Sequence, residues 1–258
     1  MISNFNAKCN NNYFNYDLSN QFMKSDPAKH YDEMGDPYVR KNEKDIHNAY
    51  YNNPAIKSLI SDINNKTVLE VGCGGGIQTE WLINQGANVI AFDISEKMVE
   101  YTKRRIGTRA DIRVADLSQP LDFIASNSID VIVASLVLHY IDNWLPVFEE
   151  FQRVLKEDGY IIISIHHPHA DWKWFNKPNY FKKELYEDSW TIEGKPYNVT
   201  YYHRTLANIF AIFRKYDFYV DVLLEPLPTK EGKDVDSQAY EKLLTRPHFL
   251  FLRLKKIK

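Results

Sequence analysis

The sequence predicts a doubly wound α/β fold, in which helices cover both faces of a mostly parallel sheet. Three observations lead to this prediction. Between residues 67 and 164, short apolar segments alternate with amphipathic segments of helical spacing, which is the order of βαβ units. Some of the apolar segments are nearly continuous, as strands buried on both faces are. A glycine-rich turn at 72–76 joins the first apolar segment directly to the helix that follows it.

The alternation assigns each element in order along the chain. We expect strands at 67–71, 88–92, 111–115, 129–134 and 160–164. A helix begins near Ile77 and Gly86 closes it; further helices are expected at 96–105 and 144–155, with Gly159 ending the latter. A helix at 206–213 and strands at 218–224 and 248–254, possibly antiparallel, complete the chain, with a loop around Gly232 between these strands.

The segment before the first strand is expected to form a cap. Residues 1 to about 25 are rich in Asn without a clear period, which indicates a mobile arm or an irregular cap. Residues 44–60 show a helical pattern that Pro54 should split into two short helices. We therefore divide the chain into an N-terminal arm and helical cap, residues 1–60, and a domain of residues 61–258.

The composition of the chain excludes several classes of function. The 258 residues carry 32 Lys and Arg against 34 Asp and Glu, so no basic surplus points to nucleic acid. The two cysteines, Cys9 and Cys73, match neither a metal site nor a disulfide framework. No apolar run approaches the roughly 20 residues that span a bilayer, and residues 1–8 lack the apolar run of a signal peptide. We expect a cytoplasmic protein with no nucleic-acid or membrane partner.

The glycine turn is the most informative motif. Glycines at 72, 74, 75 and 76 allow a tight turn and a close approach of a ligand to the backbone, and the helix N-terminus beyond offers free N–H donors. A dinucleotide-binding pattern would place a glycine at 77, where Ile77 stands. No Lys followed by Ser or Thr ends the turn, which excludes a phosphate-binding P-loop.

Asp93 follows the second predicted strand at the carboxyl edge of the sheet, 21 positions after Gly72. In such folds an acidic residue about 20 positions on accepts hydrogen bonds from ribose hydroxyls. The alternative is a helix-capping role, although Ser95 could supply that cap instead.

The glycine turn and Asp93 resemble the motifs of class I S-adenosylmethionine-dependent methyltransferases, of the branch called methyltransferase type 11. Four later segments resemble that family in order and spacing, at 90–98, 115–117, 130–139 and 153–159. The resemblance covers about residues 66–165. It implies a Rossmann-like, seven-stranded, mostly parallel sheet with an N-terminal helical cap and a lid insertion after strand five, at 166–204.

The resemblance also implies the residues that bind S-adenosyl-L-methionine. The methionine moiety would be lined by Gly72, Gly74 and Gly76, with Glu70 orienting its amino group and Ser135 nearby. Asp93 would bind the ribose, and Ile94 and Met98 would flank the adenosine. The adenine would be surrounded by Ala115, Asp116 and Leu117. Two of these residues have a structural alternative. Met98 could be a core residue, and Ser135 could satisfy its own backbone.

Methyl transfer requires alignment of nucleophile and methyl, and a base only when the acceptor must lose a proton. His139, just past the fourth strand, could be a general base, pack under the cofactor or cap the next helix. The segment at 134–136, Ala-Ser-Leu, differs from the Asn/Asp-Pro-Pro-Tyr/Phe of relatives that methylate amino groups of adenine or glutamine. This difference argues against those acceptors.

The insertion at 166–204 is expected to shape the acceptor pocket. His166, His167 and His169 are too closely spaced to converge on one ion, so we predict no metal site. Ten aromatic residues and a hairpin at 190–199 suit a lid that excludes water from an apolar or aromatic acceptor, although most of the rings would simply pack. Tyr31 and Tyr38 are possible contacts from the N-terminal cap.

The predicted function is transfer of a methyl group from S-adenosylmethionine to O, N or C of a small molecule. Two alternatives remain from the residues. One is a nicotinamide-dependent oxidoreductase, which Ile77 disfavours. The other is a non-catalytic protein that binds S-adenosylmethionine and regulates a partner, because a glycine turn indicates binding and not turnover.

Overall fold

The computed structural model describes residues 26–258 and contains the predicted sheet. Its strands lie in the order β3 (Asp111–Val114), β2 (Asn88–Asp93), β1 (Thr67–Val71), β4 (Ile129–Ser135), β5 (Leu155–His166), β9 (Phe249–Lys256) and β8 (Phe218–Leu224). Strand β9 runs antiparallel to both of its neighbours, and the other pairings are parallel. The seven-stranded, mostly parallel fold is therefore confirmed. The chain order reverses at β1, which pairs with β2 on one side and β4 on the other, and ligands bind at such switch points.

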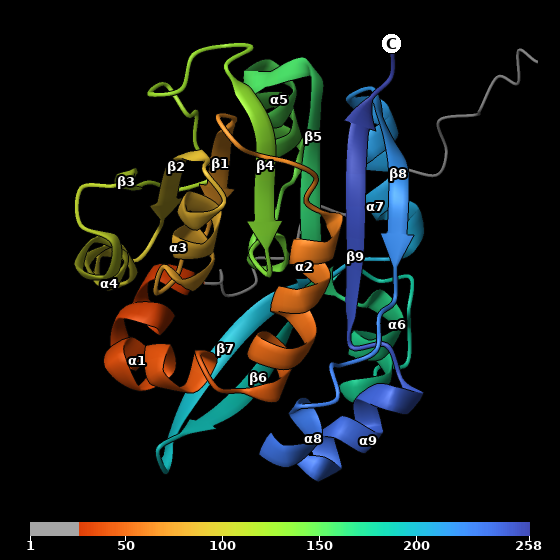
Figure 1. Cartoon of the computed structure of the whole chain (residues 1–258). Helices are drawn as coiled ribbons and strands as arrows, with labels where there is room; N and C mark the ends of the chain where they lie inside the picture. The colour runs from red at the N-terminus through yellow and green to blue at the C-terminus, as the bar shows by residue number, and fades with distance from the viewer. Residues whose placement is uncertain (1–25) are drawn as a thin grey trace, which may run out of the picture.

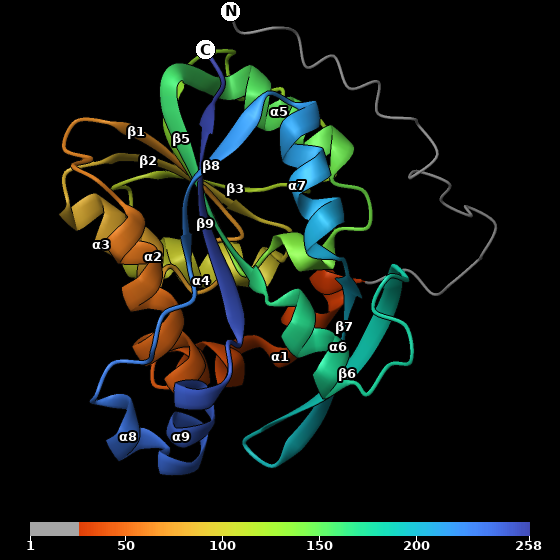
Figure 2. The same ribbon diagram turned by 90° about the vertical axis from the view of Figure 1, so that its right-hand side faces the viewer.

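Helices cover both faces of the sheet (Figures 1 and 2). One face carries α2 (Asn53–Leu59), α3 (Ile77–Asn84) and α4 (Glu96–Ile106), and the other carries α5 (Leu145–Val154) and α7 (Leu206–Lys215). Successive residues of β1 belong to different cores, Val68 to the first face and Leu69 to the second. This alternation of side chains along each strand builds the two apolar layers of a doubly wound fold.

A third group of elements gathers beyond the carboxyl ends of the parallel strands, at the bottom of Figure 1. It contains α1 (Pro27–Asn42), α6 (Pro168–Trp174), the antiparallel hairpin of β6 (Glu184–Ile192) and β7 (Lys195–His203), α8 (Gly232–Val235) and α9 (Ser237–Thr245). A small separate core joins α1 to the hairpin through Met34 and Tyr186. These elements cover the edge of the sheet where a ligand is expected.

The predicted helix break at Pro54 was wrong. The helical backbone continues from the π-helix η2 (Asn48–Asn52) into α2, and Pro54 takes one of the first two positions of α2. Pro54 has no N–H to donate, and the carbonyl four residues before it, Tyr50 O, accepts a hydrogen bond from Thr229 N at 2.8 Å instead.

The prediction that Gly159 ends the helix before β5 was also wrong. Helix α5 ends at Val154, and Gly159 lies inside β5 where the pairing with β4 shifts register. A Cβ at this glycine would lie 2.7 Å from Leu155 Cδ1 and 2.9 Å from Asp130 O. Gly159 therefore serves the close approach of two strands and not a helix cap.

The segment around Gly232 is not the predicted loop but contains α8 and α9. Asp236 caps α9 by accepting a hydrogen bond from Ala239 N, and Leu243 is buried beneath the helix. Leu243 is the one buried residue of this helix, so its apolar stripe was too short to predict it.

Most of the other predicted strands and helices match within two residues, but β5 begins at Leu155, five residues before its predicted start, and α1 and α6 were not predicted. Strands β1 and β8 have their predicted bounds, and Gly86 follows α3 with φ +84°, as predicted for its C-terminal cap. The hairpin turns at Glu193 and Gly194 but is longer than predicted. The Asn-rich arm lies outside the described residues, and the division of the chain at residue 60 stays a prediction. From residue 26 onward, no helix has the length and apolar character needed to cross a bilayer.

Candidate functional site

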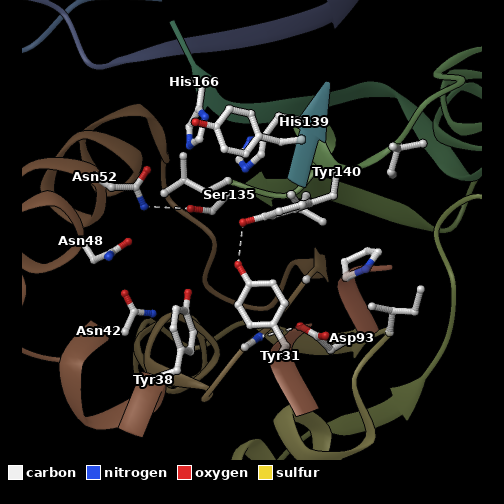
Figure 3. Close-up of a pocket in the computed structure, with 18 of the residues that line it drawn as sticks. Tyr31, Tyr38, Asn42, Asn48, Asn52, Asp93, Ser135, His139, Tyr140 and His166 are labelled. Carbon is white, nitrogen blue, oxygen red and sulfur yellow. Dashed lines mark hydrogen bonds between the residues drawn. The ribbon is translucent and has the colours of Figure 1, made fainter. Parts of the chain in front are cut away.

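A cavity of about 1130 Å³ lies at the carboxyl edge of the sheet, between the β1–β4 switch point and the covering group of elements. Two halves can be distinguished by their lining. The glycine-loop half is lined by the turn at 72–75 and the residues that follow β2 and β3. The aromatic half is lined by α1, η2, α6, the hairpin and the residues at the ends of β4 and β5 and the start of β9. Figure 3 shows the two halves meeting between Asp93 and Ser135.

The glycines of the turn serve different purposes. Gly72 and Gly74 have φ values of +73° and +53°, which favour glycine. A Cβ at Gly72 would lie 2.9 Å from Val137 Cγ2, whereas one at Gly74 would meet no atom within 4 Å. Gly76 does not line the cavity, and its Cβ would meet Thr102 of α4. Gly74 therefore leaves open space beside the loop, while Gly76 allows the loop to approach α4.

Asp93 holds the glycine turn in place. Its Oδ2 accepts a hydrogen bond from Gly74 N at 2.9 Å, and its Oδ1 accepts one from Ser95 N at 3.0 Å. Ser95 is the cap of α4, because its Oγ accepts from Met98 N. Burial raises the pKa of Asp93 despite these backbone hydrogen bonds. The carboxylate lines the cavity beside the turn (Figure 3), with its oxygens already aligned by two N–H donors.

Glu70 is a buried carboxylate on β1 that also lines the cavity. Only 2% of it is exposed, and its Oε2 has no hydrogen-bond partner among residues 26–258. Burial raises its pKa to about 8, so the carboxyl group is largely protonated near pH 7. A cation or a hydrogen-bond donor beside it would be needed to hold its ionised form. The glycine-loop half thus fits a ligand that brings a positively charged group to Glu70.

The other residues predicted for the cofactor divide between the cavity and the core. Ile94, Ala115, Asp116 and Leu117 line the glycine-loop half. Asp116 also accepts a hydrogen bond from Ser118 N at 2.8 Å. Met98 is fully buried and does not line the cavity, as expected for a core residue.

Ser135 belongs to a hydrogen-bond network that connects three elements. Asn52 of η2 donates from Nδ2 to Ser135 Oγ at 2.9 Å, and Ser164 Oγ of β5 donates to Asn52 Oδ1 at 2.8 Å. The next residue, Leu136, has φ +52°, an uncommon conformation for a residue with a side chain. Ser135 is therefore tied to Asn52, a residue that the sequence analysis missed because nothing local marks it.

Imidazoles cluster in the aromatic half. His139 stacks on His166 with ring centroids 4.1 Å apart, and His248 lies beside His47 at 4.9 Å. Burial, with the charge of Arg204, lowers the pKa of His139 to about 3, and its Nδ1 has no hydrogen-bond partner in the described chain. Burial lowers the pKa of His248 to about 3 as well. The rings of His139 and His248 are therefore neutral near pH 7.

The three histidines after strand five separate in space. His166 lines the cavity, with Nδ1 at 3.5 Å from Asp171 Oδ1. His167 does not, because its Nε2 pairs with Glu225 at 3.1 Å, and His169 is also absent from the lining. Over the part of the chain that the structure describes, no three His, Cys, Asp or Glu side chains are placed to hold a metal ion.

Aromatic rings close the cavity from α1 and the hairpin. Tyr31 and Tyr140 share a hydrogen bond between their hydroxyls at 2.8 Å (Figure 3). Tyr38 stacks on Trp190 with an interplanar angle of 11°. Five aromatic residues of the insertion line the cavity, namely Trp174, Phe175, Trp190, Tyr201 and Tyr202. Others, such as Tyr186, are buried in the small core beneath the hairpin. The insertion therefore supplies both lining and packing.

Comparison with known proteins places this cavity in a family context. A family model described as a methyltransferase domain matches residues 69–163. An uncharacterized protein of Haemophilus influenzae is 26% identical over 229 residues, which is 81% of this chain and 89% of that protein. The crystal structure of a protein from Listeria monocytogenes, described as an S-adenosylmethionine-dependent methyltransferase, aligns with a TM-score of 0.68 and 26% identity over 80% of this chain and 97% of that one.

A ubiquinone biosynthesis O-methyltransferase of Nitrosomonas europaea is 29% identical over 112 residues. This match covers 42% of this chain and 47% of the relative, so it spans about half the length of that enzyme.

Proposed function

The chain belongs to the class I S-adenosylmethionine-dependent methyltransferases, and we propose that it transfers the methyl group to a small molecule held in the aromatic half of the cavity. This membership replaces the two alternatives that the residues alone left open, a nicotinamide-dependent oxidoreductase and a non-catalytic binding protein. We also propose which residues hold the methyl donor and what kind of acceptor fits.

The observation that carries the proposal is the unpartnered carboxylate of Glu70 beside the open space at Gly74. S-adenosylmethionine brings an ammonium group on its methionine end, which would give Glu70 the cation that it lacks. Gly72 and Gly74 would leave room for the methionine chain, and Ser135 would lie at its far side.

The adenosine end would lie across the ends of β2 and β3. Asp93 is proposed to accept hydrogen bonds from the ribose hydroxyls with the lone pairs that its two backbone donors leave over. Ile94 would flank the adenosine, with Ala115, Asp116 and Leu117 around the adenine. We assign Gly76 and Met98 a supporting role, because they shape the turn and α4 from outside the cavity.

S-adenosylmethionine supplies an already activated methyl group, so the protein's task is alignment and exclusion of water. The hairpin and α1 would exclude water, and Arg40 links them through two hydrogen bonds of 3.0 Å to Glu193. His139 is proposed as a neutral hydrogen-bonding group on the acceptor, because its lowered pKa makes it a weak base. Its Nδ1 is buried and has no hydrogen-bond partner among the described residues.

A small acceptor fits the dimensions of the site. The whole cavity measures about 1130 Å³, above the range of roughly 300–1,000 Å³ typical for one small ligand, so it has room for S-adenosylmethionine and a small acceptor together. The remaining space is lined by rings, which suits a compact apolar or aromatic molecule.

The proposal is tested by incubating the full chain with S-adenosylmethionine and a panel of small aromatic acceptors, and measuring S-adenosylhomocysteine. We expect acceptor-dependent release that the Gly74→Ala variant loses. Donor binding without acceptor-dependent release from any small molecule, but with release from protein or RNA extracts, would contradict a small acceptor.

A further inference from the structure

We propose that the acceptor is an uncharged nitrogen compound, an amine or a ring nitrogen, which attacks the methyl group with a free lone pair. The inference rests on the proposed function and deepens it by naming the acceptor class. It depends on the charge of the cavity lining, on the neutral rings of the aromatic half, and on the direction in which methyl transfer moves charge.

The lining of the cavity is strongly acidic. It contains one basic side chain, Lys41, and no Arg in residues 26–258. Its acidic side chains number eight, namely Asp45, Glu70, Asp93, Asp116, Asp142, Asp171, Asp188 and Asp236. Lys41 lies at an exposed position and donates to Thr191 O at 3.5 Å. A carboxylate or phosphate on the acceptor would meet like charge and little to pair with, which is costly in a buried site.

The cations and imidazoles around the aromatic half do not reverse this charge. Arg204 is not part of the cavity lining. Its guanidinium donates to the Ile141 and Asp142 carbonyls and lies over the ring of Trp144, with Cζ 4.6 Å from the ring centroid. Lys183 pairs with Asp142 at 2.6 Å. Burial keeps His139, His166 and His248 neutral by lowering the pKa of each.

Methylation of a neutral nitrogen moves a positive charge into the aromatic half. The nitrogen lone pair forms the new bond to the methyl carbon, and the methyl–sulfur bond breaks with its electron pair remaining on sulfur. Sulfonium and neutral amine thereby become thioether and methylated ammonium, and a primary or secondary amine afterwards releases one N–H proton to water. Acidic side chains and aromatic faces stabilise such a cation.

Two of the acidic side chains lie beside aromatic rings. Asp188 Oδ2 on the hairpin accepts a hydrogen bond from Trp190 Nε1 at 2.9 Å, which holds an acid beside an aromatic ring. Asp171 is buried against the His166 and His203 rings, at 3.5 and 3.9 Å. Both carboxylates line the aromatic half.

A hydroxyl acceptor fits the aromatic half less well. A hydroxyl must lose its proton as it attacks, which calls for a base whose pKa lies near the working pH. His139 and His248 have pKa values of about 3 and cannot hold that proton near neutrality. Burial raises the pKa of Asp171 to about 6, but its two carboxylate oxygens face the rings of His166 and His203. An amine or ring nitrogen in its neutral form needs no base before attack.

The first experiment screens ring compounds in matched sets that carry an amine, a hydroxyl or a carboxylate on the same skeleton. Thermal stabilisation of the full chain saturated with S-adenosylhomocysteine is the measurement. We expect amines or ring nitrogens to stabilise the protein and carboxylates not to do so. Carboxylates that stabilise as often as amines, or a screen in which no nitrogen compound stabilises, would overturn the inference.

The second experiment is the pH profile of kcat/KM with two amines of different pKa. We expect the rate to rise to a plateau whose midpoint follows the pKa of the amine supplied. A midpoint that stays fixed when the amine is changed would overturn the inference, because it would report an enzyme base.

The matched variants are Asp188→Asn in the aromatic half and Asp122→Asn, an exposed acid outside the lining. We expect KM for the amine to rise about tenfold in Asp188→Asn, with no change in Asp122→Asn and an unchanged affinity for S-adenosylmethionine in both. Equal KM values in the two variants would count against a role for the acidic side chains of the aromatic half. Asp171→Asn serves as a second variant. Calorimetry with S-adenosylmethionine keeps the outcomes apart, because loss of donor binding refutes the proposed function instead.

Discussion

The two halves of the cavity are built in different ways. The glycine-loop half comes from short segments at or just after the carboxyl ends of β1, β2 and β3, at 70–75, 93–94 and 115–117. The aromatic half takes its lining from α1, η2, β5, α6, the hairpin and β9, which are far apart in the sequence. Backbone shape defines the first half, and side chains brought together by tertiary packing define the second.

The proposed donor site and the proposed acceptor site are therefore encoded by different kinds of sequence feature. Backbone conformation and a few buried carboxylates, which recur in order along the chain, define the proposed donor site. The acceptor site depends on the covering elements, which have their own small core around Met34 and Tyr186. Substitutions in the two halves should therefore differ in kind, and the following predictions test that difference from the largest effect to the smallest.

Gly72→Ala and Gly74→Ala form a matched pair in the glycine turn. Both positions have positive φ, but only the Cβ at Gly72 would meet a neighbour, Val137 Cγ2 at 2.9 Å. We expect Gly72→Ala to lower the free energy of unfolding by about 2–5 kcal/mol through strain and overpacking. Gly74→Ala should lose only about 1–2 kcal/mol, yet weaken S-adenosylmethionine binding roughly tenfold or more. Urea unfolding and calorimetry separate the two, and equal stability losses would contradict the assignment.

Glu70→Gln should stabilise the ligand-free protein at high pH. The folded-state pKa of Glu70 is raised from 4.5 to about 8, so its contribution to stability is present below pH 4.5 and is lost as the pH rises through 8. Between pH 6 and pH 9 the wild type should lose roughly 2–3 kcal/mol relative to the variant. The variant should also bind S-adenosylmethionine more weakly.

Urea unfolding of both proteins at the two pH values checks this prediction. Glu100→Gln, at an exposed position of α4, is the control and should show no such pH-dependent difference. A parallel pH dependence in wild type and Glu70→Gln would mean that the carboxyl is not held protonated by burial.

Asp93→Ala should weaken S-adenosylmethionine binding by about 1–3 kcal/mol, because the ribose loses an acceptor and the N–H groups of Gly74 and Ser95 lose theirs. Calorimetry with the wild type beside the variant measures the loss. An unchanged affinity would remove Asp93 from the donor site.

Arg40→Ala should have the smallest effect, at the boundary between α1 and the hairpin. Arg40 and Glu193 are joined by two hydrogen bonds, but more than half of each side chain is exposed. We expect a change of less than about 1 kcal/mol in the free energy of unfolding, because the buried rings hold the hairpin. A loss of several kcal/mol on thermal or urea unfolding would show that the ion pair, and not the small core, fixes the lid.

The glycine-loop half and most of the sheet were predictable because their signals are local. A strand, its glycine turn and its helix lie within 18 residues, and Gly72, Asp93 and Asp116 each follow their own strand. The errors also have local causes. Gly159 resembled a helix cap but is required by contact with Asp130 O, and Pro54 resembled a helix break but opens α2.

The aromatic half was predictable only as a class of residues. The rings of the insertion indicated a lid, but nothing in the sequence connects Asn52 to Ser135 or His248 to His47. Those pairs are 83 and 201 positions apart and meet only when η2 and β9 assemble on the edge of the sheet. Of the three adjacent histidines, tertiary packing alone decides that His166 faces the cavity and His167 faces Glu225.

The most direct test of this account is a calorimetric titration of the full chain with S-adenosylmethionine, with Gly74→Ala beside the wild type. The account predicts one binding site per wild-type chain and at least roughly tenfold weaker binding in the variant, equivalent to about 1.4 kcal/mol. A folded wild-type protein that shows neither binding heat nor thermal stabilisation, or a variant with wild-type affinity, would contradict it.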